Sequence, residues 1–132
     1  MAGAADFPDT LPGLLATNAA QWPDDVAMRE KDLGYWHSYT WTDYQRGVCE
    51  IALGLEALGI SEDDVVALIG DNRPEWVWGE IAAHAVRARS LGLYRDVLED
   101  ELFWLADLRA QDRLQKVILF CYNAMSITQI SR

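Results

Sequence analysis

The sequence predicts an α/β fold with a mostly parallel sheet, and the evidence for it lies between residues 64 and 94. Residues 65–69 are apolar without interruption, which is typical of a strand covered on both faces in a parallel sheet. A polar turn then leads to Pro74, which suits the first position of a helix because its missing N–H would have no partner there. A second strand is predicted over residues 90–94, and the three elements make a right-handed βαβ unit.

An amphipathic helix is predicted earlier in the chain, over residues 10–21. Asp9 or Thr10 is placed to cap its N-terminus, and Pro12 is tolerated because it lies in the first turn. The predicted buried face follows helical spacing and consists of Leu11, Leu14, Leu15, Asn18 and Ala19.

Two strands are predicted next, over residues 26–31 and 35–41. The first alternates in character, and the second is rich in aromatic residues and threonine. The short loop of residues 32–34 contains glycine, so the two runs predict a β-hairpin. His37 lies in the second run and is interpreted as a half-exposed strand residue rather than a catalytic base, since no nucleophile pattern accompanies it.

The clearest helix is predicted over residues 42–58. Thr42 and Gln45 have the spacing of a capping box, in which each side chain satisfies a backbone N–H of the first turn. Gly59 follows where a left-handed C-cap is expected. Cys49 neighbours the apolar stripe and is interpreted as unreactive. The stripe itself consists of Tyr44, Val48, Ile51, Ala52, Leu55 and Leu58.

A second crossover helix is predicted over residues 74–88, with a wide apolar face for packing on a sheet. Its cap has two candidates, because Asn72 is the better capping residue while Arg73 immediately precedes Pro74. His84 lies within this helix and is interpreted as a packed or exposed residue rather than a ligand-binding one.

Beyond these elements a further helix is predicted over residues 98–107 and a strand over residues 116–122, while residues 123–132 have no strong pattern. The predicted helix over residues 98–107 carries four acidic residues, Glu99, Asp100, Glu101 and Asp107. Because adjacent acidic side chains on a helix point in different directions, this cluster is interpreted as a solvated first turn that the helix dipole favours, and not as a metal site.

Composition limits the classes of function. The chain of 132 residues fits one domain, and its hydrophobic content of 51% with six tryptophans predicts a globular protein. The formal charge is −10: residues 1–85 carry 15 acidic and 4 basic side chains, and residues 86–132 carry 6 and 7. Because an acidic front half repels phosphate backbones, nucleic-acid binding is not expected.

The two cysteines, Cys49 and Cys121, have no CxxC or Cys/His spacing around them. They predict reduced thiols in a cytoplasmic protein, with neither a disulfide framework nor a metal site. The first residues lack the pattern of a secretory signal, and no window is long and apolar enough for a transmembrane helix.

Two motifs carry a family resemblance: GDNRPEW at residues 70–76, after an apolar strand and before a helix, and LGLYRDVLEDE at residues 91–101. Together they resemble the N-terminal region of AMP-binding (adenylate-forming) acyl-CoA synthetases, of the long-chain fatty-acid–CoA ligase type. The resemblance spans roughly residues 8–101 and implies a partial N-terminal subdomain of that fold. We therefore divide the chain into residues 1–101, the family-like part, and 102–132, which we expect to be a divergent tail produced by truncation or by a change of reading frame.

The resemblance implies a chemistry whose machinery is not found in these residues. Such enzymes use ATP and magnesium to form an acyl-adenylate, which coenzyme A then converts to a thioester. They need a Ser/Thr/Gly-rich loop with a following lysine to cradle the triphosphate. The only lysines here are Lys31 and Lys116, and neither follows such a loop. No catalytic, cofactor-binding or metal residue is assigned, and no cofactor is expected for this chain by itself.

The leading hypothesis is therefore an N-terminal fragment of an acyl-CoA synthetase that is inactive alone. The alternative is a free-standing α/β interaction module, with self-association through an exposed sheet edge or apolar face. A flavodoxin-like nucleotide-binding domain ranks last because no phosphate loop follows the buried strand; residues 70–73 stand where α/β proteins bind ligands but lack further glycines.

Overall fold

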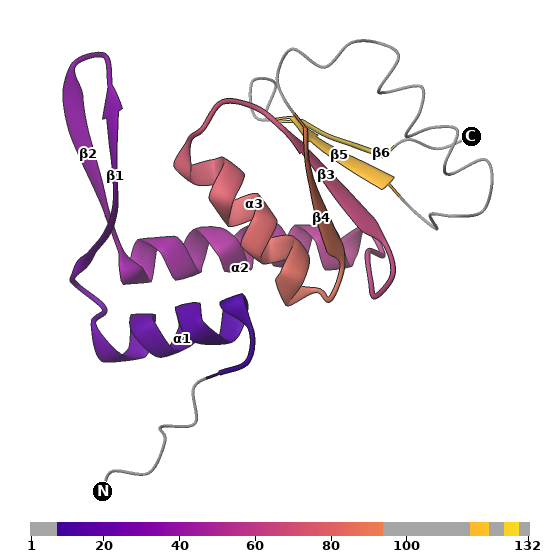
Figure 1. Cartoon of the computed structure of the whole chain (residues 1–132), viewed down its shortest axis with the longest axis horizontal. Coiled ribbons are helices and arrows are strands. Elements are labelled where there is room, and N and C mark those ends of the chain that lie inside the picture. The colour runs from indigo at the N-terminus through magenta and orange to yellow at the C-terminus, as the bar shows by residue number, and fades with distance from the viewer. Residues whose placement is uncertain (1–7, 94–116, 122–125, 130–132) are drawn as a thin grey trace, which may run out of the picture.

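The computed structural model describes residues 8–93, 117–121 and 126–129. Figure 1 shows a hairpin of β1 and β2 that stands beside the helices, while the other strands form a sheet against α3. The predicted α/β class is confirmed. In chain order the elements are α1 (Leu11–Gln21), β1 (Val26–Asp32), β2 (Tyr35–Thr40), α2 (Trp41–Ala57), β3 (Val65–Ile69), α3 (Pro74–Ala85), β4 (Arg89–Leu93), β5 (Val117–Cys121) and β6 (Ser126–Gln129).

The larger sheet has the strand order β4-β3-β5-β6. β3 pairs in parallel with β4 and with β5, so Val65 lies opposite Arg89 on one side and Val117 on the other. β6 completes the sheet antiparallel to β5. The sheet is thus mostly parallel, as predicted, and residues 65–68 at its centre are buried, as a strand covered on both faces requires.

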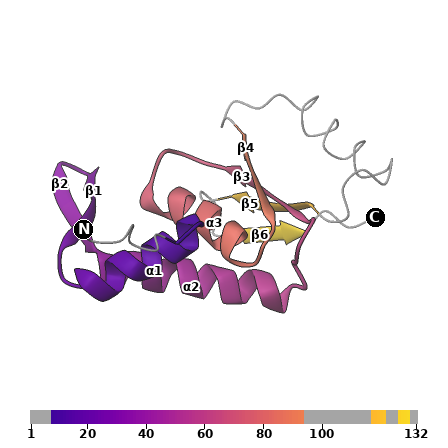
Figure 2. The same ribbon diagram turned by 60° about the horizontal axis from the view of Figure 1, so that its bottom comes forward.

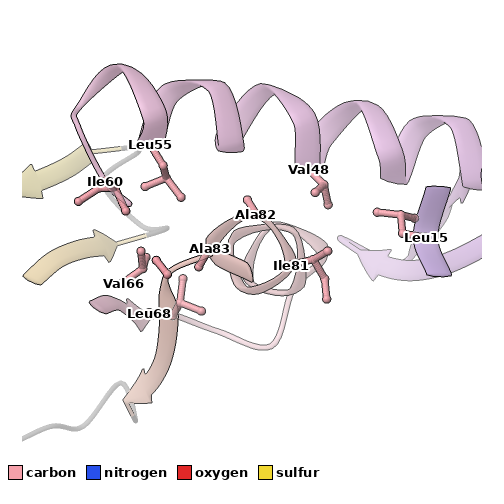
Figure 3. Close-up of a cluster of buried hydrophobic side chains, with 10 residues drawn as sticks. Leu15, Val48, Leu55, Ile60, Val66, Leu68, Ile81, Ala82 and Ala83 are labelled. Carbon is pink, nitrogen blue, oxygen red and sulfur yellow. The ribbon is translucent and has the colours of Figure 1, made fainter. Parts of the chain in front are cut away.

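α3 lies between the sheet and α2, and α1 packs beside both helices (Figure 2). Figure 3 shows the core side chains pointing toward one another from α2, α3 and β3. Small side chains at Ala82 and Ala83 let α3 approach both neighbouring layers, and both are fully buried. The buried cluster consists of Leu15, Val48, Leu55, Ile60, Val66, Leu68, Ile81, Ala82, Ala83 and Ala88.

α2 begins at Trp41, and the capping box predicted at Thr42 and Gln45 is wrong. Thr40 is the N-cap: its hydroxyl accepts a hydrogen bond from the N–H of Asp43 at 3.1 Å, and the carboxylate of Asp43 accepts one from the N–H of Thr40 at 3.0 Å. Thr42 instead donates its hydroxyl to the carbonyl of Pro23 at 2.9 Å. The hairpin decides this start, because β2 ends at Thr40 and delivers it to the first turn.

The predicted end of α2 is confirmed. Gly59 adopts a φ of 76°, and the N–H of Ile60 donates to the carbonyl of Leu55 at 3.0 Å, which closes the helix in a Schellman motif. Leu55 and Ile60 are both in the core, so the cap also places an apolar contact. Leu58, predicted in the buried stripe, is 42% exposed because it lies at the cap.

α3 is shorter than predicted, ending at Ala85. Arg73 is its N-cap and makes no side-chain capping hydrogen bond. At the other end Arg87 has a φ of 67°, and the N–H of Ala88 donates to the carbonyl of Ala83 at 2.9 Å. This turn reverses the chain into β4, which therefore begins at Arg89 rather than at residue 90.

α1 is capped by Thr10, whose hydroxyl accepts from the N–H of Gly13 at 3.2 Å. Its predicted buried face is only partly buried. Leu15 is in the core, whereas Leu11 is 53% and Leu14 38% exposed. The main contacts of α1 are with α2 and α3, and part of its predicted apolar face stays exposed.

The described tail adds to the sheet. The strand predicted over residues 116–122 is confirmed as β5, and β6 lies in residues 123–132, for which no strand was predicted. The predicted helix over residues 98–107 lies outside the described residues, as do Glu99, Asp100, Glu101 and Asp107. None of the described helices has both the length and the apolar character needed to cross a bilayer.

Candidate functional site

The C-terminal ends of β3 and β5 form the edge at which the strand order reverses. β3 leads through α3 to β4 on one side, whereas β5 lies on its other side. In open α/β sheets such a reversal leaves a crevice beyond the carboxyl ends of the strands, where ligands bind. The loop of residues 70–73 leaves β3 at this edge, so its side chains and their neighbours are the first candidates for a functional site.

Arg73 and Glu30 join this loop to the hairpin. The Nε atom of Arg73 lies 2.8 Å from Oε1 of Glu30 and 4.0 Å from Oε2 of Glu75. The hydroxyl of Tyr39 donates to the other carboxylate oxygen of Glu30 at 3.2 Å. Burial, and then the negative charge of Glu30, raises the pKa of Tyr39 above 10.0, so the phenol stays protonated as a donor.

Trp78 on α3 holds the hairpin against the helices. Its ring packs edge-to-face with Tyr39, with centroids 5.4 Å apart and an interplanar angle of 84°. Gly47 of α2 also lies so close that a Cβ there would be 2.7 Å from the Trp78 ring. The hairpin, α2 and α3 therefore meet at one side chain, which fixes the position of the hairpin together with the Arg73–Glu30 pair.

An open depression of about 580 Å³ lies between β1 and the loop. Its lining residues include no serine, cysteine or histidine, so it offers binding groups and no nucleophile of those types. Across the described ranges, no set of His, Cys, Asp and Glu side chains is arranged to hold a metal ion. The charges on its lining balance, with Arg29, Lys31 and Arg73 against Glu30, Asp32 and Asp71.

The sequence model that defines the family of AMP-binding enzymes matches residues 15–110 of this chain. That span includes the hairpin, the buried strand, the loop and α3. This chain belongs to the AMP-binding enzyme family. Of the resemblance predicted from the motifs GDNRPEW and LGLYRDVLEDE, membership of the AMP-binding family is thereby confirmed.

Solved structures agree with membership of the AMP-binding enzyme family. The chain is similar to the fatty acid AMP ligase from Legionella pneumophila, with a TM-score of 0.69 and 14% identity over 84% of this chain and 19% of that one. It is also similar to the N-terminal subdomain of Klebsiella oxytoca NpsA in complex with 3-hydroxyanthranilyl-AMSN, with a TM-score of 0.67 and 17% identity over 87% of this chain and 28% of that one. These likenesses show the fold of an N-terminal subdomain of adenylate-forming enzymes.

A relative of this AMP-binding family member is an uncharacterized protein of Mycobacterium tuberculosis. The two are 32% identical over 100 residues, which is 76% of this chain and 56% of the relative. The corresponding protein of a second strain matches over 54% of its length. The chain thus spans about half the length of the curated relatives it matches.

Among the described residues, the other side chains that the sequence singled out lie on separate elements. Nε2 of His84 lies 2.9 Å from Oγ of Ser90, so His84 joins the last turn of α3 to β4, which fits the first of the two predicted roles, packing or exposure. His37 is exposed on the hairpin, and Cys49 is exposed on α2. Cys121 lies in β5, and its side chain is outside the described part.

Sequence reasoning missed the contacts that position the loop. Glu30 and Tyr39 lie far from Arg73 in the chain, and no periodic pattern links a hairpin to a helix cap. The alternation in residues 26–31 did place Glu30 on one face of a strand, but only the packing of the hairpin on α3 shows what that face contacts.

Proposed function

We propose that this chain forms the N-terminal scaffold of an AMP-forming acyl-CoA synthetase. The parent reaction converts a carboxylic acid, ATP and CoA to acyl-CoA, AMP and pyrophosphate, with magnesium. The match to the AMP-binding family over residues 15–110 carries this proposal, and the fold, with the loop at the C-terminal edge of a parallel sheet, supports it. We place the protein in the cytoplasm, where the exposed thiol of Cys49 stays reduced.

We assign a fatty acid as the substrate of the parent enzyme. The motifs at residues 70–76 and 91–101 resemble the long-chain type, and the Legionella pneumophila neighbour is by its name a fatty acid AMP ligase. An aromatic acid is the competing substrate class, because the NpsA subdomain was solved with 3-hydroxyanthranilyl-AMSN.

We further propose that the chain does not activate acids by itself. Activation needs positive charge and aligned N–H groups around the triphosphate. Lys31, the lysine in the described part, has its ammonium group 5.8 Å from the centroid of the Trp36 ring on the hairpin, away from any glycine-rich loop. The residues that would hold ATP, magnesium and CoA are therefore expected outside these ranges.

ATP–pyrophosphate exchange on the purified chain tests this proposal. We expect no exchange above background with saturated fatty acids of increasing length or with an aryl acid such as 3-hydroxybenzoate. Acid-dependent exchange would contradict the claim of inactivity, and the acid that supports it would identify the substrate class. Titration calorimetry with AMP provides a second reading, for which no heat of binding is expected.

The rival function, an interaction module without catalysis, is favoured by a different observation. β4 and β6 lie at the edges of the larger sheet, so each leaves one side without a strand partner among the described residues. Sedimentation velocity distinguishes the interaction module from the enzyme scaffold. A concentration-dependent dimer that is lost when Gly92 in β4 is replaced by proline would support the module.

A further inference from the structure

The hairpin has two chemically different faces, and its register defines them. Directly paired residues of an antiparallel ladder point to the same side, and the side alternates along each strand. Lys31 pairs with Trp36 and Arg29 with Ser38, so these four residues share what we call the outer face. The pairs that alternate with these two along the ladder point to the opposite side, which we call the inner face. They are Met28 with Tyr39, Glu30 with His37, and Asp32 with Tyr35.

The inner face is the one fixed to the rest of the molecule. Glu30 reaches Arg73 at 2.8 Å, and Tyr39 packs edge-to-face on Trp78. The outer face is on the opposite side of the ladder from these contacts, and Arg29, Lys31, Trp36 and Ser38 are all exposed; Arg29 and Lys31 also border the depression beside the loop. The hairpin therefore presents a defined surface to its surroundings.

Charge is segregated between the two faces. Both carboxylates of β1, Glu30 and Asp32, lie on the inner face, and both cations lie on the outer face. Residues 1–85 contain 4 basic side chains against 15 acidic ones, and two of the four are Arg29 and Lys31. The outer face is thus a basic surface on the acidic front part of the chain.

The tip of the hairpin, residues 33–36, exposes large apolar side chains. Leu33 is 91%, Tyr35 75% and Trp36 67% exposed. Leu33 has a φ of 47° and Gly34 a φ of 88°, as in a two-residue turn that favours asparagine and glycine. A leucine in this left-handed conformation works against local stability, so folding of the hairpin does not account for it.

The aromatic residues are of the type that occupies a lipid–water interface. Tryptophan and tyrosine have an apolar body with a polar tip and gather at the headgroup level of membranes. Lys31 lies with its ammonium 5.8 Å from the centroid of the Trp36 ring, which combines a cation with an aromatic surface. A long lysine stem can lie along apolar surface while its charge stays among the headgroups.

We propose that the hairpin docks through its tip and outer face onto the surface of an anionic phospholipid bilayer. Leu33, Tyr35 and Trp36 enter the headgroup boundary, and Arg29 and Lys31 contact lipid phosphates. Charge complementarity selects this partner, because the outer face carries cations and no carboxylate while the surrounding protein is acidic. The inference does not depend on the proposed acyl-CoA synthetase function.

Vesicle co-sedimentation tests the proposal with the whole chain. Two vesicle preparations are compared: phosphatidylcholine alone, and equal parts of phosphatidylcholine and phosphatidylglycerol. We expect binding to the anionic vesicles that weakens with added salt, since screening reduces the headgroup attraction. Trp36→Ala should lower the partition coefficient by about tenfold, whereas Trp22→Ala, which removes an exposed tryptophan outside the hairpin, should leave it unchanged.

Leu33→Asn separates binding from folding. Asparagine tolerates the left-handed conformation at this position, so the variant should melt at a higher temperature than the parent. It should nevertheless bind vesicles about tenfold more weakly, because an apolar contact is lost. The double variant Arg29→Ser/Lys31→Ser should lose the preference for anionic over neutral vesicles.

Several outcomes overturn the proposal. They are the absence of parent binding to either vesicle type, equal losses in Trp36→Ala and Trp22→Ala, and undiminished binding in Leu33→Asn. If Trp36→Ala converts a dimer to a monomer and no variant changes lipid binding, the tip is a surface for a second copy of the chain, and the lipid proposal is rejected.

Discussion

The guanidinium of Arg73 lies 2.8 Å from the carboxylate of Glu30, across the gap between the N-terminus of α3 and the middle of β1. The side chains are 30% and 12% exposed, so this is a partly buried pair rather than a surface one. It fixes the hairpin relative to the loop at the C-terminal end of β3. Both the proposed scaffold and the orientation of the outer face depend on this connection.

Breaking this pair should destabilise the protein. Glu30→Gln keeps the shape of the side chain and removes the charge beside Arg73, with an expected loss of about 1–3 kcal/mol in the free energy of unfolding. Glu62→Gln is the matched control, because Glu62 pairs with Arg87 at 3.0 Å but is 61% exposed; about 0.5 kcal/mol or less is expected there. Urea unfolding followed by fluorescence measures both, and equal losses would show that the pair contributes no more than a surface ion pair.

Two glycines of α2 should respond in opposite directions to alanine. Gly47→Ala would place a Cβ 2.7 Å from the ring of Trp78, so the contact with Tyr39 must shift, and we expect a loss of about 1–3 kcal/mol. Gly54→Ala meets no atom within 4 Å and should gain about 0.5–1 kcal/mol from helix propensity. Thermal unfolding of the two variants and the parent measures these changes in stability. Stabilisation by Gly47→Ala would mean that Trp78 does not pack as described.

The capping box at Thr40 predicts a loss on its removal. Thr40→Ala leaves the first-turn N–H of Asp43 without its cap, at a cost of about 1 kcal/mol in the stability of the folded protein. Thr40→Ser keeps the hydroxyl and should retain most of the stability. Gln45→Ala, at the position that the sequence wrongly assigned to a capping box, should be close to neutral. Chemical denaturation of the three variants distinguishes the two assignments.

Asp43 should contribute stability that depends on pH. Hydrogen bonds from the N–H and then the hydroxyl of Thr40 lower the pKa of Asp43 below 3.8 in the folded protein. Because the folded pKa is the lower one, this contribution is complete above pH 3.8 and is lost as the pH falls through the folded value. Asp43→Asn should therefore be less stable than the parent at neutral pH, and the difference should vanish in acid. A difference that persists below the folded pKa would argue against the carboxylate as its source.

The sequence by itself determined which segments form most of the helices and strands. An uninterrupted apolar run marked β3 because a strand covered on both faces has no polar side to signal. Gly59 marked the end of α2 because a left-handed cap favours glycine. The motif GDNRPEW marked the family, since its residues lie together in the chain. These features are local, so a linear pattern is enough to specify them.

Only the tertiary structure decided which residues act together. The hairpin moved the start of α2 to Trp41 and its cap to Thr40, because strand pairing fixed where β2 ends. Ser126–Gln129 became a strand by pairing with β5, without a strong pattern of its own. The pairing of Glu30 with Arg73 depends on how the hairpin lies on α3. Long-range packing energies select these contacts, and no local signal in the sequence records them.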